Sequence, residues 1–199
     1  MEFSGALKMV HQLLLMRLPQ ARCIVDATAG NGKDTLFLAT HSVTGARIWA
    51  FDIQEQAIIN SKQLLLDNHC HNKVEYILDS HCNMDLYISG QVDIVTFNLG
   101  YLPGGNHNIT TTGQTTVQAL NKSIQLLRVN GIITVVAYPG YATGKEENNQ
   151  VLKYVSSLPQ SVFNVGCWQM LNQANEPPVL YIVEKKRGEV REGFASRED

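Results

Sequence analysis

Four side chains that carry hydrogen-bonding oxygens come where buried strands are expected to end. Asp26, Asp52 and Asp79 each follow a short apolar run, and Asn98 follows another, VDIVTF. In an open α/β sheet, ligands bind outside the carboxyl ends of the parallel strands. We therefore expect these four side chains to converge on one crevice. Carboxylates there can hold ribose hydroxyl groups or a positively charged centre, and a carboxamide can orient an amine.

The stretch from Val25 to Leu38 reads VDATAGNGKDTLFL and predicts the end of a strand, a glycine turn and the start of a helix. Gly30 and Gly32 allow a tight turn because they have no Cβ, and Asn31 tolerates a left-handed backbone. A ligand over this turn would meet backbone N–H groups and the positive end of a helix dipole. The alternative is a strand-to-helix turn that binds nothing.

The acidic residue before this turn indicates the kind of ligand. Asp26 would repel a phosphate, and a dinucleotide fingerprint would place a third glycine or alanine where Thr35 stands. A carboxylate suits a ligand with a positive centre and an amino group, and S-adenosylmethionine has both. Asp52 stands roughly 20 residues after Gly30, the spacing at which an acidic residue holds ribose hydroxyls. Nicotinamide enzymes and methyltransferases share this device, and an ordinary helix N-cap is the alternative for Asp52.

Four motifs follow the order found in class I S-adenosylmethionine-dependent methyltransferases. They are DATAGNGKDT (26–35), FDIQ (51–54), LDSH (78–81) and NLGYLPGG (98–105). The chain most resembles the small bacterial family labelled "putative rRNA methylases", whose characterised members methylate the aminomethyl group of 5-aminomethyl-2-thiouridine at the tRNA wobble position. The resemblance covers roughly residues 1–185. It implies an α/β fold with a Rossmann-like sheet of seven strands, mostly parallel and ending in a C-terminal antiparallel hairpin.

The resemblance also implies a role for each motif toward the cofactor, S-adenosyl-L-methionine. The glycine turn would hold the methionine part, with Asp26 near its ammonium group. Asp52 would hold the ribose, and Asp79 with Ser80 the adenine. The full set of predicted cofactor-binding residues is Asp26, Thr28, Gly30, Asn31, Gly32, Asp34, Asp52, Gln54, Asp79, Ser80, His81 and Asn98.

The acceptor side is predicted from Asn98 to Tyr101, which resembles the N/D-P-P-Y/F signature of amino-group methyltransferases but has Leu99 and Gly100 in place of the prolines. In that signature the carboxamide oxygen accepts a hydrogen bond from the target nitrogen, and the aromatic ring stacks on a base. Losing both prolines relaxes a geometry that an exocyclic ring amine needs more than an aliphatic aminomethyl group does. The alternative is a plain turn after a strand. The predicted substrate-binding residues are Leu99, Gly100, Tyr101, His107 and Tyr141.

An aliphatic amine target sets a chemical requirement. An alkylammonium has an ordinary pKa of about 10, as in lysine, and only its neutral form attacks. The site must therefore lower that pKa or supply a base. We expect His81 or His107 to accept the proton, which makes Asn98, Tyr101 and His81 the predicted catalytic residues. The alternative for His81 is a surface or capping histidine.

The composition is that of one globular domain. Of 199 residues, 44% are hydrophobic and 17% are charged, so we expect a methyltransferase domain over residues 1–185 and a polar, disordered tail over residues 186–199. No run is long enough to span a membrane and no signal peptide is evident, which favours the cytoplasm. Four scattered cysteines without a CxxC motif read as reduced thiols, and no metal site is expected. A net charge of −2 gives no electrostatic footprint for RNA over the whole molecule.

Hydrophobic periodicity predicts which segments form the strands and helices that position these residues. Apolar runs predict strands at 24–26, 47–52, 74–78, 92–98, 132–138, 162–169 and 179–184. Helical spacing predicts helices at 6–18, 33–40, 54–66, 115–128 and 144–157, with a polar loop over 104–116. The first helix would cover the sheet or a partner subunit, and together with the resemblance it favours a homodimer.

Three other functions stay open at this point. The acceptor could be an rRNA base or a protein nitrogen rather than tRNA. A nicotinamide-dependent oxidoreductase would also use a glycine turn with Asp52, but it would require the third glycine. A non-catalytic RNA-binding protein could keep the pocket without the chemistry. Mass spectrometry of nucleosides from a deletion strain would separate the methyltransferase substrates, and calorimetry with S-adenosylmethionine and NAD would test the other two functions.

Overall fold

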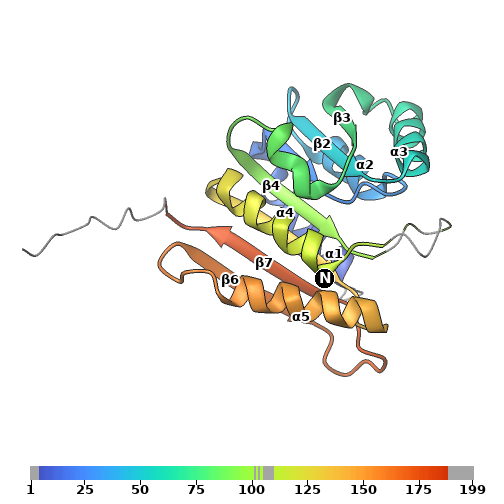
Figure 1. Cartoon of the computed structure of the whole chain (residues 1–199). Coiled ribbons are helices and arrows are strands. Elements are labelled where there is room, and N and C mark those ends of the chain that lie inside the picture. Colours follow the sequence, from blue (N-terminus) through green and yellow to red (C-terminus); the bar gives the residue numbers. More distant parts are fainter. Residues whose placement is uncertain (1–4, 101, 103, 105–109, 188–199) are drawn as a thin grey trace, which may run out of the picture.

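The computed structural model describes residues 5–100, 102, 104 and 110–187, which form one α/β fold (Figure 1). Its single sheet has seven strands in the order β3-β2-β1-β4-β5-β7-β6. The first five strands pair in parallel, and β7 is antiparallel to both β5 and β6. The strands are β1 (Cys23–Asp26), β2 (Arg47–Asp52), β3 (Val74–Leu78), β4 (Val92–Asn98), β5 (Leu127–Ala137), β6 (Phe163–Gln169) and β7 (Val179–Lys185). The predicted mostly parallel sheet with a C-terminal hairpin is confirmed.

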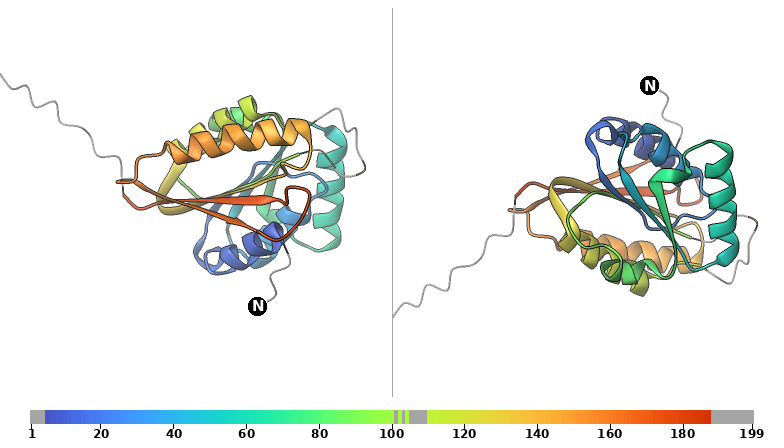
Figure 2. Two further views of the ribbon diagram at one scale, coloured as in Figure 1. Left: turned by 90° about the horizontal axis from the view of Figure 1, so that it is seen from below. Right: turned by 90° about the horizontal axis from the view of Figure 1, so that it is seen from above.

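Helices cover both faces of the sheet, as the two views in Figure 2 show. One face carries α1 (Ala6–Leu15), α2 (Lys33–His41) and α3 (Glu55–Asp67), and the other carries α4 (Gly113–Leu126) and α5 (Ala142–Ser156). Three short 3-10 helices, η1 (Leu18–Gln20), η2 (His71–Lys73) and η3 (His81–Leu86), complete the described elements. Because β1 to β4 run parallel, their carboxyl ends lie at the same end of the sheet, where the polar side chains were expected.

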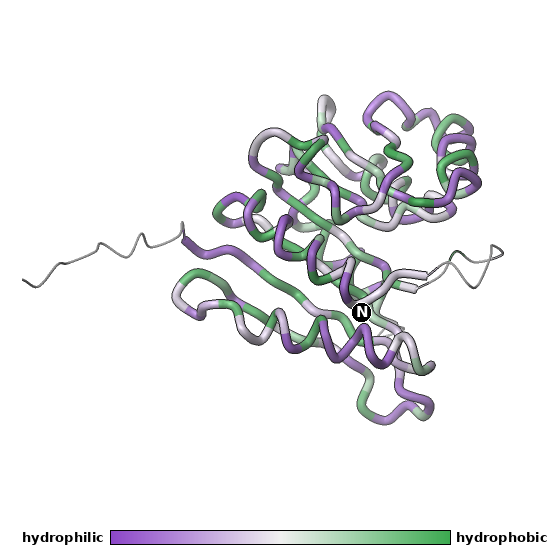
Figure 3. Tube along the Cα trace, in the orientation of Figure 1, coloured by the Kyte–Doolittle hydropathy of each residue, from purple (hydrophilic) through white to green (hydrophobic). Residues whose placement is uncertain are grey.

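The core consists of two apolar clusters, one on each face of the sheet. Successive strand residues alternate between them, since side chains along a strand point to opposite faces. In β4, for example, Ile94 packs with α1 and α2, whereas Val95 and Phe97 pack with α4 and α5. Figure 3 shows the result as hydrophobic strands, with helices that alternate hydrophobic and hydrophilic segments. Within the described residues, no helix has the length and apolar content to cross a membrane.

Several element boundaries differ from the sequence prediction. Helix α1 ends at Leu15 rather than residue 18, because the chain tightens into η1, which has Pro19 in its first turn. Helix α4 begins at Gly113 rather than residue 115, since the Thr112 side chain caps it by accepting a hydrogen bond from the Thr115 backbone N–H. These shifts leave the order and type of every predicted element unchanged.

Strand β5 begins five residues earlier than residue 132, where the sequence placed it. Val92 pairs with Leu127 but Ile94 pairs with Ile132, so extra β5 residues are accommodated in a bulge. Asn130 has φ +64° there, which asparagine tolerates. The Asn130-Gly131 pair thus bends a strand instead of starting one.

The C-terminal boundary lies slightly beyond the predicted one. The backbone N–H of Lys186 donates to the Val162 carbonyl at 2.8 Å, and the Lys186 Nζ donates to the Gln160 carbonyl at 2.7 Å. Lys186 is therefore bonded to the domain and does not belong to a tail. Residues 188–199 lie outside the described residues, so the predicted tail stays a prediction. The homodimer also stays a prediction.

Candidate active site

The glycine turn after β1 has the backbone that the sequence predicts. Gly30 has φ +51° and Gly32 has φ +83°, both in the left-handed region that favours glycine. A Cβ on Gly32 would lie 2.7 Å from the Ser61 Cα, because α3 packs directly against the turn. Glycine at position 32 is therefore required both by the backbone conformation and by the close approach of α3.

The N–H groups of this turn are used within the protein. The Gly30 N–H donates to Asp52 at 2.9 Å, and the Gly32 N–H donates to the Ala29 carbonyl at 2.9 Å. The Ala29 N–H in turn donates to the Phe51 carbonyl at 2.8 Å. The expectation that a ligand would meet free N–H groups is therefore wrong for Gly30 and Gly32. The bonds of Gly30 and Ala29 fasten the turn to the end of β2, and the Gly32 bond closes the turn on itself.

Asp26 lies beneath the turn and supports it. Its side chain is 1% exposed, and its oxygens accept hydrogen bonds from the Thr28 N–H at 3.1 Å and the Thr35 hydroxyl at 2.6 Å. Burial, with the nearby Asp34 carboxylate as the second cause, raises the pKa of Asp26 to about 7. This burial leaves no room for a direct contact between Asp26 and a ligand, and the expected position of Asp26 near the ligand's ammonium group stays a prediction. The carboxyl instead fixes the shape of the turn, because the first helical turn folds over it.

Asp52 joins the ends of β1 and β2. One carboxylate oxygen accepts the Gly30 N–H, and the other accepts the Gln54 N–H at 2.9 Å. Each oxygen retains a further acceptor position. Gln54 occupies the N-cap of α3, and no side chain caps that helix. The alternative of Asp52 as an ordinary N-cap is therefore wrong, and its carboxylate stays available for hydroxyl groups.

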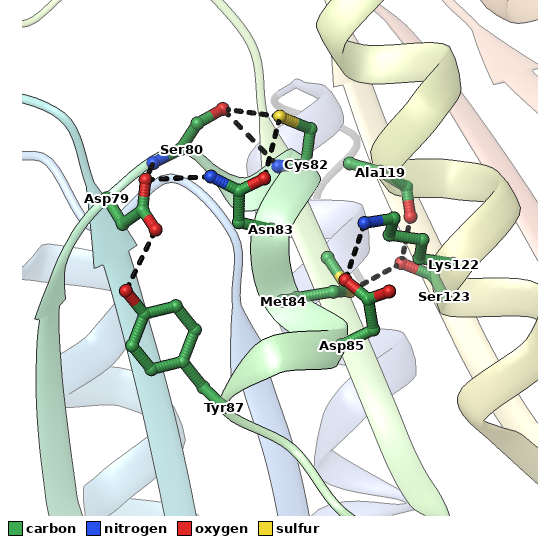
Figure 4. A network of polar contacts seen from close by, with 10 residues as sticks. All are labelled: Asp79, Ser80, Cys82, Asn83, Met84, Asp85, Tyr87, Ala119, Lys122 and Ser123. Carbon is green, nitrogen blue, oxygen red and sulfur yellow. Dashed lines mark hydrogen bonds and ion pairs between the residues drawn. The ribbon is translucent and has the colours of Figure 1, made fainter.

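A polar network surrounds Asp79 at the end of β3 (Figure 4). Its oxygens accept hydrogen bonds from the Ser80 N–H at 2.7 Å, the Asn83 amide at 3.0 Å and the Tyr87 hydroxyl at 2.8 Å. These hydrogen bonds, the Tyr87 bond first, hold the pKa of Asp79 below its ordinary value. The Tyr87 ring meets Phe51 edge-on, with centroids 5.7 Å apart. Asp79 thus stays ionised beside the exposed Tyr87 ring and can accept a hydrogen bond from the exocyclic amine of a base.

His81 lies below the strand ends. Its Nδ1 lies 2.9 Å from the Ala27 carbonyl, so Nδ1 carries the proton that this contact requires. Burial lowers the pKa of His81, and its side chain packs edge-on against Phe97. Its Nε2 is buried without a hydrogen-bond partner among the described residues. His81 is 8% exposed, and its lowered pKa makes it a weak base. This burial under Ala27 does not fit its expected role as proton acceptor.

Asn98 is held at three points. Its backbone N–H donates to the Thr28 hydroxyl at 2.7 Å, its Nδ2 donates to Asp34 at 3.1 Å, and its Oδ1 accepts from the Tyr138 hydroxyl at 2.9 Å. His11 Nε2 lies 2.8 Å from the other Asp34 oxygen. Burial raises the pKa of Tyr138 to about 12, so it stays a hydroxyl donor. The carboxamide orientation is fixed, because a carboxylate can only accept and therefore must face Nδ2.

The segment after Asn98 is tied to α4 and α5. The Gly100 N–H donates to the Thr111 hydroxyl at 2.8 Å, and that hydroxyl donates to Glu147 at 2.8 Å. The other Glu147 oxygen accepts from the Thr116 hydroxyl at 2.7 Å. Gly100 has φ +116°, which favours glycine at this position and explains the departure from proline. The predicted residues Tyr101 and His107 lie outside the described residues.

Leu99 and Tyr141, two further predicted substrate residues, differ in their exposure to solvent. Leu99 is 4% exposed, and its N–H donates to the Val136 carbonyl, so it anchors the segment in the core. Tyr141 is 37% exposed, and its hydroxyl lies 3.2 Å from where a Gly100 Cβ would be. Leu102 reaches back over the glycine turn, since its Cδ1 lies 3.6 Å from the Cβ position of Gly30. The acceptor segment and the cofactor turn are therefore neighbours.

The chain is similar in sequence to a known protein family and to a protein with a named activity. The family model described as "Putative rRNA methylase" matches residues 48–184. A chloroplastic tRNA (mnm5s2U34)-methyltransferase from Arabidopsis thaliana is 32% identical over 91% of this chain and 70% of that protein. The chain belongs to this rRNA methylase family.

Solved structures agree with this assignment. A "putative rRNA-methylase" from Clostridium thermocellum is 44% identical, with a TM-score of 0.90 over 93% of this chain and 100% of that chain. A "putative methyltransferase" from Streptococcus mutans, in complex with SAH, is 34% identical, with a TM-score of 0.84 over 92% of this chain and 99% of that chain. The resemblance inferred from the four motifs is therefore confirmed, and so is the methyltransferase fold.

In a methyltransferase fold, the hydrogen bonds between these residues mark the region where the cofactor and the acceptor would meet. The rRNA methylase fold brings the glycine turn, Asp52 and Asn98 into one bonded assembly through Gly30 and Thr28. It leaves Asp26 and His81 beneath that assembly as supporting residues. Among the described residues, no group of three or more histidine, cysteine or acidic side chains could hold a metal ion.

Three contributors to the site were missed by the sequence analysis, namely His11, Tyr87 and Tyr138. His11 lies in a helix that was judged only by its apolar spacing. Tyr138 directly follows β5 at the same edge as Asn98, and the rule that ligands bind at strand ends could have found it. Tyr87 follows a 3-10 helix that no periodicity announced, so no signal pointed to it.

Proposed function

We propose that this rRNA methylase family member transfers a methyl group from S-adenosyl-L-methionine to the primary amine of 5-aminomethyl-2-thiouridine at the wobble position of tRNA. The observation that carries this proposal is the hydrogen bond between the Asn98 backbone and Thr28. It joins the acceptor segment directly to the turn that would hold the cofactor. The Arabidopsis relative carries this activity in its name, at 32% identity.

The cofactor is S-adenosyl-L-methionine, in agreement with the SAH complex of the Streptococcus mutans relative. Asp52 offers an acceptor position on each carboxylate oxygen to the ribose hydroxyls. Asp79 and Ser80 lie at the next strand end, where Asp79 can accept the adenine amine. The glycine turn gives the methionine part close access to the backbone. Asn31, whose Oδ1 accepts from Asn60 at 2.8 Å, steadies the turn from α3.

The chemistry is in-line displacement at the sulfonium methyl. The amine nitrogen attacks the methyl carbon, the C–S bond breaks, and the electron pair stays on sulfur as a neutral thioether. No covalent enzyme intermediate is needed, so the protein contributes mainly orientation. Asn98 Oδ1 is the orienting acceptor, because Tyr138 and Asp34 hold its carboxamide from both ends.

An aliphatic acceptor is favoured over a ring amine by the Asn98–Gly100 backbone. Gly100 has φ +116°, a conformation that proline cannot adopt, so the rigid double-proline geometry of ring-amine methyltransferases is absent here. Tyr141 is exposed next to Gly100 and can stack on the pyrimidine ring.

Nucleoside mass spectrometry tests this proposal. The chain is incubated with S-adenosylmethionine and a synthetic anticodon stem-loop that carries 5-aminomethyl-2-thiouridine, and the digest is analysed for the methylaminomethyl product. The matched control RNA carries 2-thiouridine without the aminomethyl group. We expect product from the first RNA alone; methylation of both RNAs at another position would refute the proposal.

A second candidate, methylation of an rRNA base, is favoured by the family's description. Unmodified rRNA in the same assay decides between the two. Methyl transfer to rRNA, with none to the aminomethyl stem-loop, would establish this second candidate in place of the first.

A further inference from the structure

A continuous chain of hydrogen bonds runs across the acceptor half of the site. It joins His11 of α1, Asp34 of α2, Asn98 of β4 and Tyr138 after β5, with distances of 2.8, 3.1 and 2.9 Å. We call these four residues the acceptor chain. The predicted ribose and adenine residues lie on the β2 and β3 side of β1, whereas the acceptor chain extends to the β4 and β5 side. This position separates it from the adenosine end of the cofactor.

Asp34 is the accessible carboxylate of the two acidic residues in the glycine-turn motif. Its side chain is 22% exposed and that of its partner His11 is 33% exposed, whereas Asp26 is 1% exposed. Each Asp34 oxygen accepts one described hydrogen bond and has room for another. Asp34 can therefore bind a donor that arrives from solvent without breaking either existing bond.

The cavity beside the acceptor chain is not where that donor would bind. It measures about 10 Å³ and is lined by His11, Asp34 and Asn98 together with apolar side chains of α1 and α2 and residues of β4 and β5. That volume suits about one water molecule and no nucleoside. A substrate amine must therefore approach Asp34 from its solvent-exposed side.

We propose that the Asp34 carboxylate, held by His11 and Asn98, binds the alkylammonium form of the acceptor and takes a proton from it, and thereby selects alkyl amines over the neutral amines of nucleobase rings. This inference rests on the proposed function and deepens it. Asp34 is assigned to the acceptor here, whereas the sequence motif placed it among the cofactor residues.

The alkylammonium loses a proton to the Asp34 carboxylate and becomes a neutral amine. The amine nitrogen forms a bond to the sulfonium methyl carbon, the C–S bond breaks, and sulfur keeps the pair. The product is a secondary ammonium, and Asp34 releases its proton to solvent. The sulfonium charge assists the first step, because a nearby like charge lowers the pKa of the ammonium.

Charge explains the selection. A neutral ring amine offers a carboxylate a hydrogen bond alone, whereas an alkylammonium adds the attraction between opposite charges to that hydrogen bond. The other titratable groups that face Asp34 are His11 on α1, Asp26 below it and Tyr138 after β5. His11 acts as a positioning residue, because its Nε2 bonds one Asp34 oxygen and leaves the carboxylate facing the acceptor.

The test compares Asp34→Asn, His11→Gln and His11→Ala with the wild type. Methylation of the aminomethyl stem-loop is measured for kcat and KM from pH 6 to 9, and SAH affinity is measured by calorimetry. Asp67→Asn, a surface carboxylate at the end of α3, is the matched control. Thermal unfolding verifies that each variant is folded.

We expect Asp34→Asn to lower kcat/KM about 100-fold near neutral pH, as is typical for loss of a proton acceptor. The deficit should shrink toward pH 9, where more of the amine is already neutral, and SAH affinity should be unchanged. His11→Gln should restore most of what His11→Ala loses, because glutamine can still donate to Asp34.

Three results would overturn the inference while leaving the proposed function intact. They are wild-type kinetics in Asp34→Asn, a deficit that does not change with pH, and a loss of SAH affinity that matches the loss of kcat/KM. The last result would return Asp34 to the cofactor. If the wild type itself does not methylate the aminomethyl stem-loop, the proposed function fails and this inference fails with it.

Discussion

Replacing Gly32 with alanine tests the close packing on which the cofactor turn depends. Gly32 has φ +83°, and a Cβ there would lie 2.7 Å from both the Cα and the Oγ of Ser61. Left-handed backbone costs an alanine about 1–2 kcal/mol, and overpacking adds about 1–3 kcal/mol. The sum predicts that Gly32→Ala lowers the free energy of unfolding by about 2–5 kcal/mol.

The chain offers a matched control. Gly45 has the same φ of +83°, but no heavy atom lies within 4 Å of its Cβ position. Gly45→Ala should therefore lose only the backbone part, about 1–2 kcal/mol. Urea unfolding of both variants gives the difference, which measures the contact with α3. Equal losses in the two variants would refute the packing argument, because the clash with Ser61 would then contribute nothing.

Asp26, Asn98 and the acceptor amine each determine a measurable property of the protein. Burial raises the Asp26 pKa to about 7. Ionisation of this group should therefore lower the free energy of unfolding of the wild type by about 3 kcal/mol between pH 5 and pH 8. Asp26→Asn should remove this pH dependence of stability. The unfolded carboxyl is already ionised over that range, and urea unfolding at the two pH values measures the loss; an equal pH dependence in the variant would contradict the assignment. Asn98→Ala should lower kcat about 100-fold or more while calorimetry shows SAH affinity largely kept, and equal losses of both would contradict its acceptor role. Wild-type turnover at saturating substrate should rise from pH 6 to pH 9, since only the neutral amine attacks, and a flat profile would count against an aliphatic amine.

Much of the fold could be predicted, because apolar periodicity and the polar residues that follow each strand can be recognised within short segments of the sequence. The ranges 47–52, 74–78 and 92–98 coincide with β2, β3 and β4. The bulge in β5 could not be predicted, because it depends on how Val92 and Ile94 pair with another strand. Register between strands is a tertiary property that no single run of residues encodes.

The sequence predicted which residues lie at the site better than it predicted what each of them does there. Asp52 and Asn98 come to the expected edge, because the carboxyl ends of parallel strands must meet there. Asp26 and His81 come to the same region but are buried beneath it. Their sequence positions give no sign of this, since burial depends on how α2 and η3 fold over them. His11 comes from a helix distant in sequence, so its bond to Asp34 could emerge only from the three-dimensional structure.

A crystal structure of the chain with SAH tests the central claim most directly. We expect both Asp52 oxygens within hydrogen-bonding distance of the ribose hydroxyls, the adenine beside Asp79, and the sulfur facing the Asn98 carboxamide. SAH bound away from the Gly30 turn, or with its sulfur on the far side of the sheet from Asn98, would contradict it.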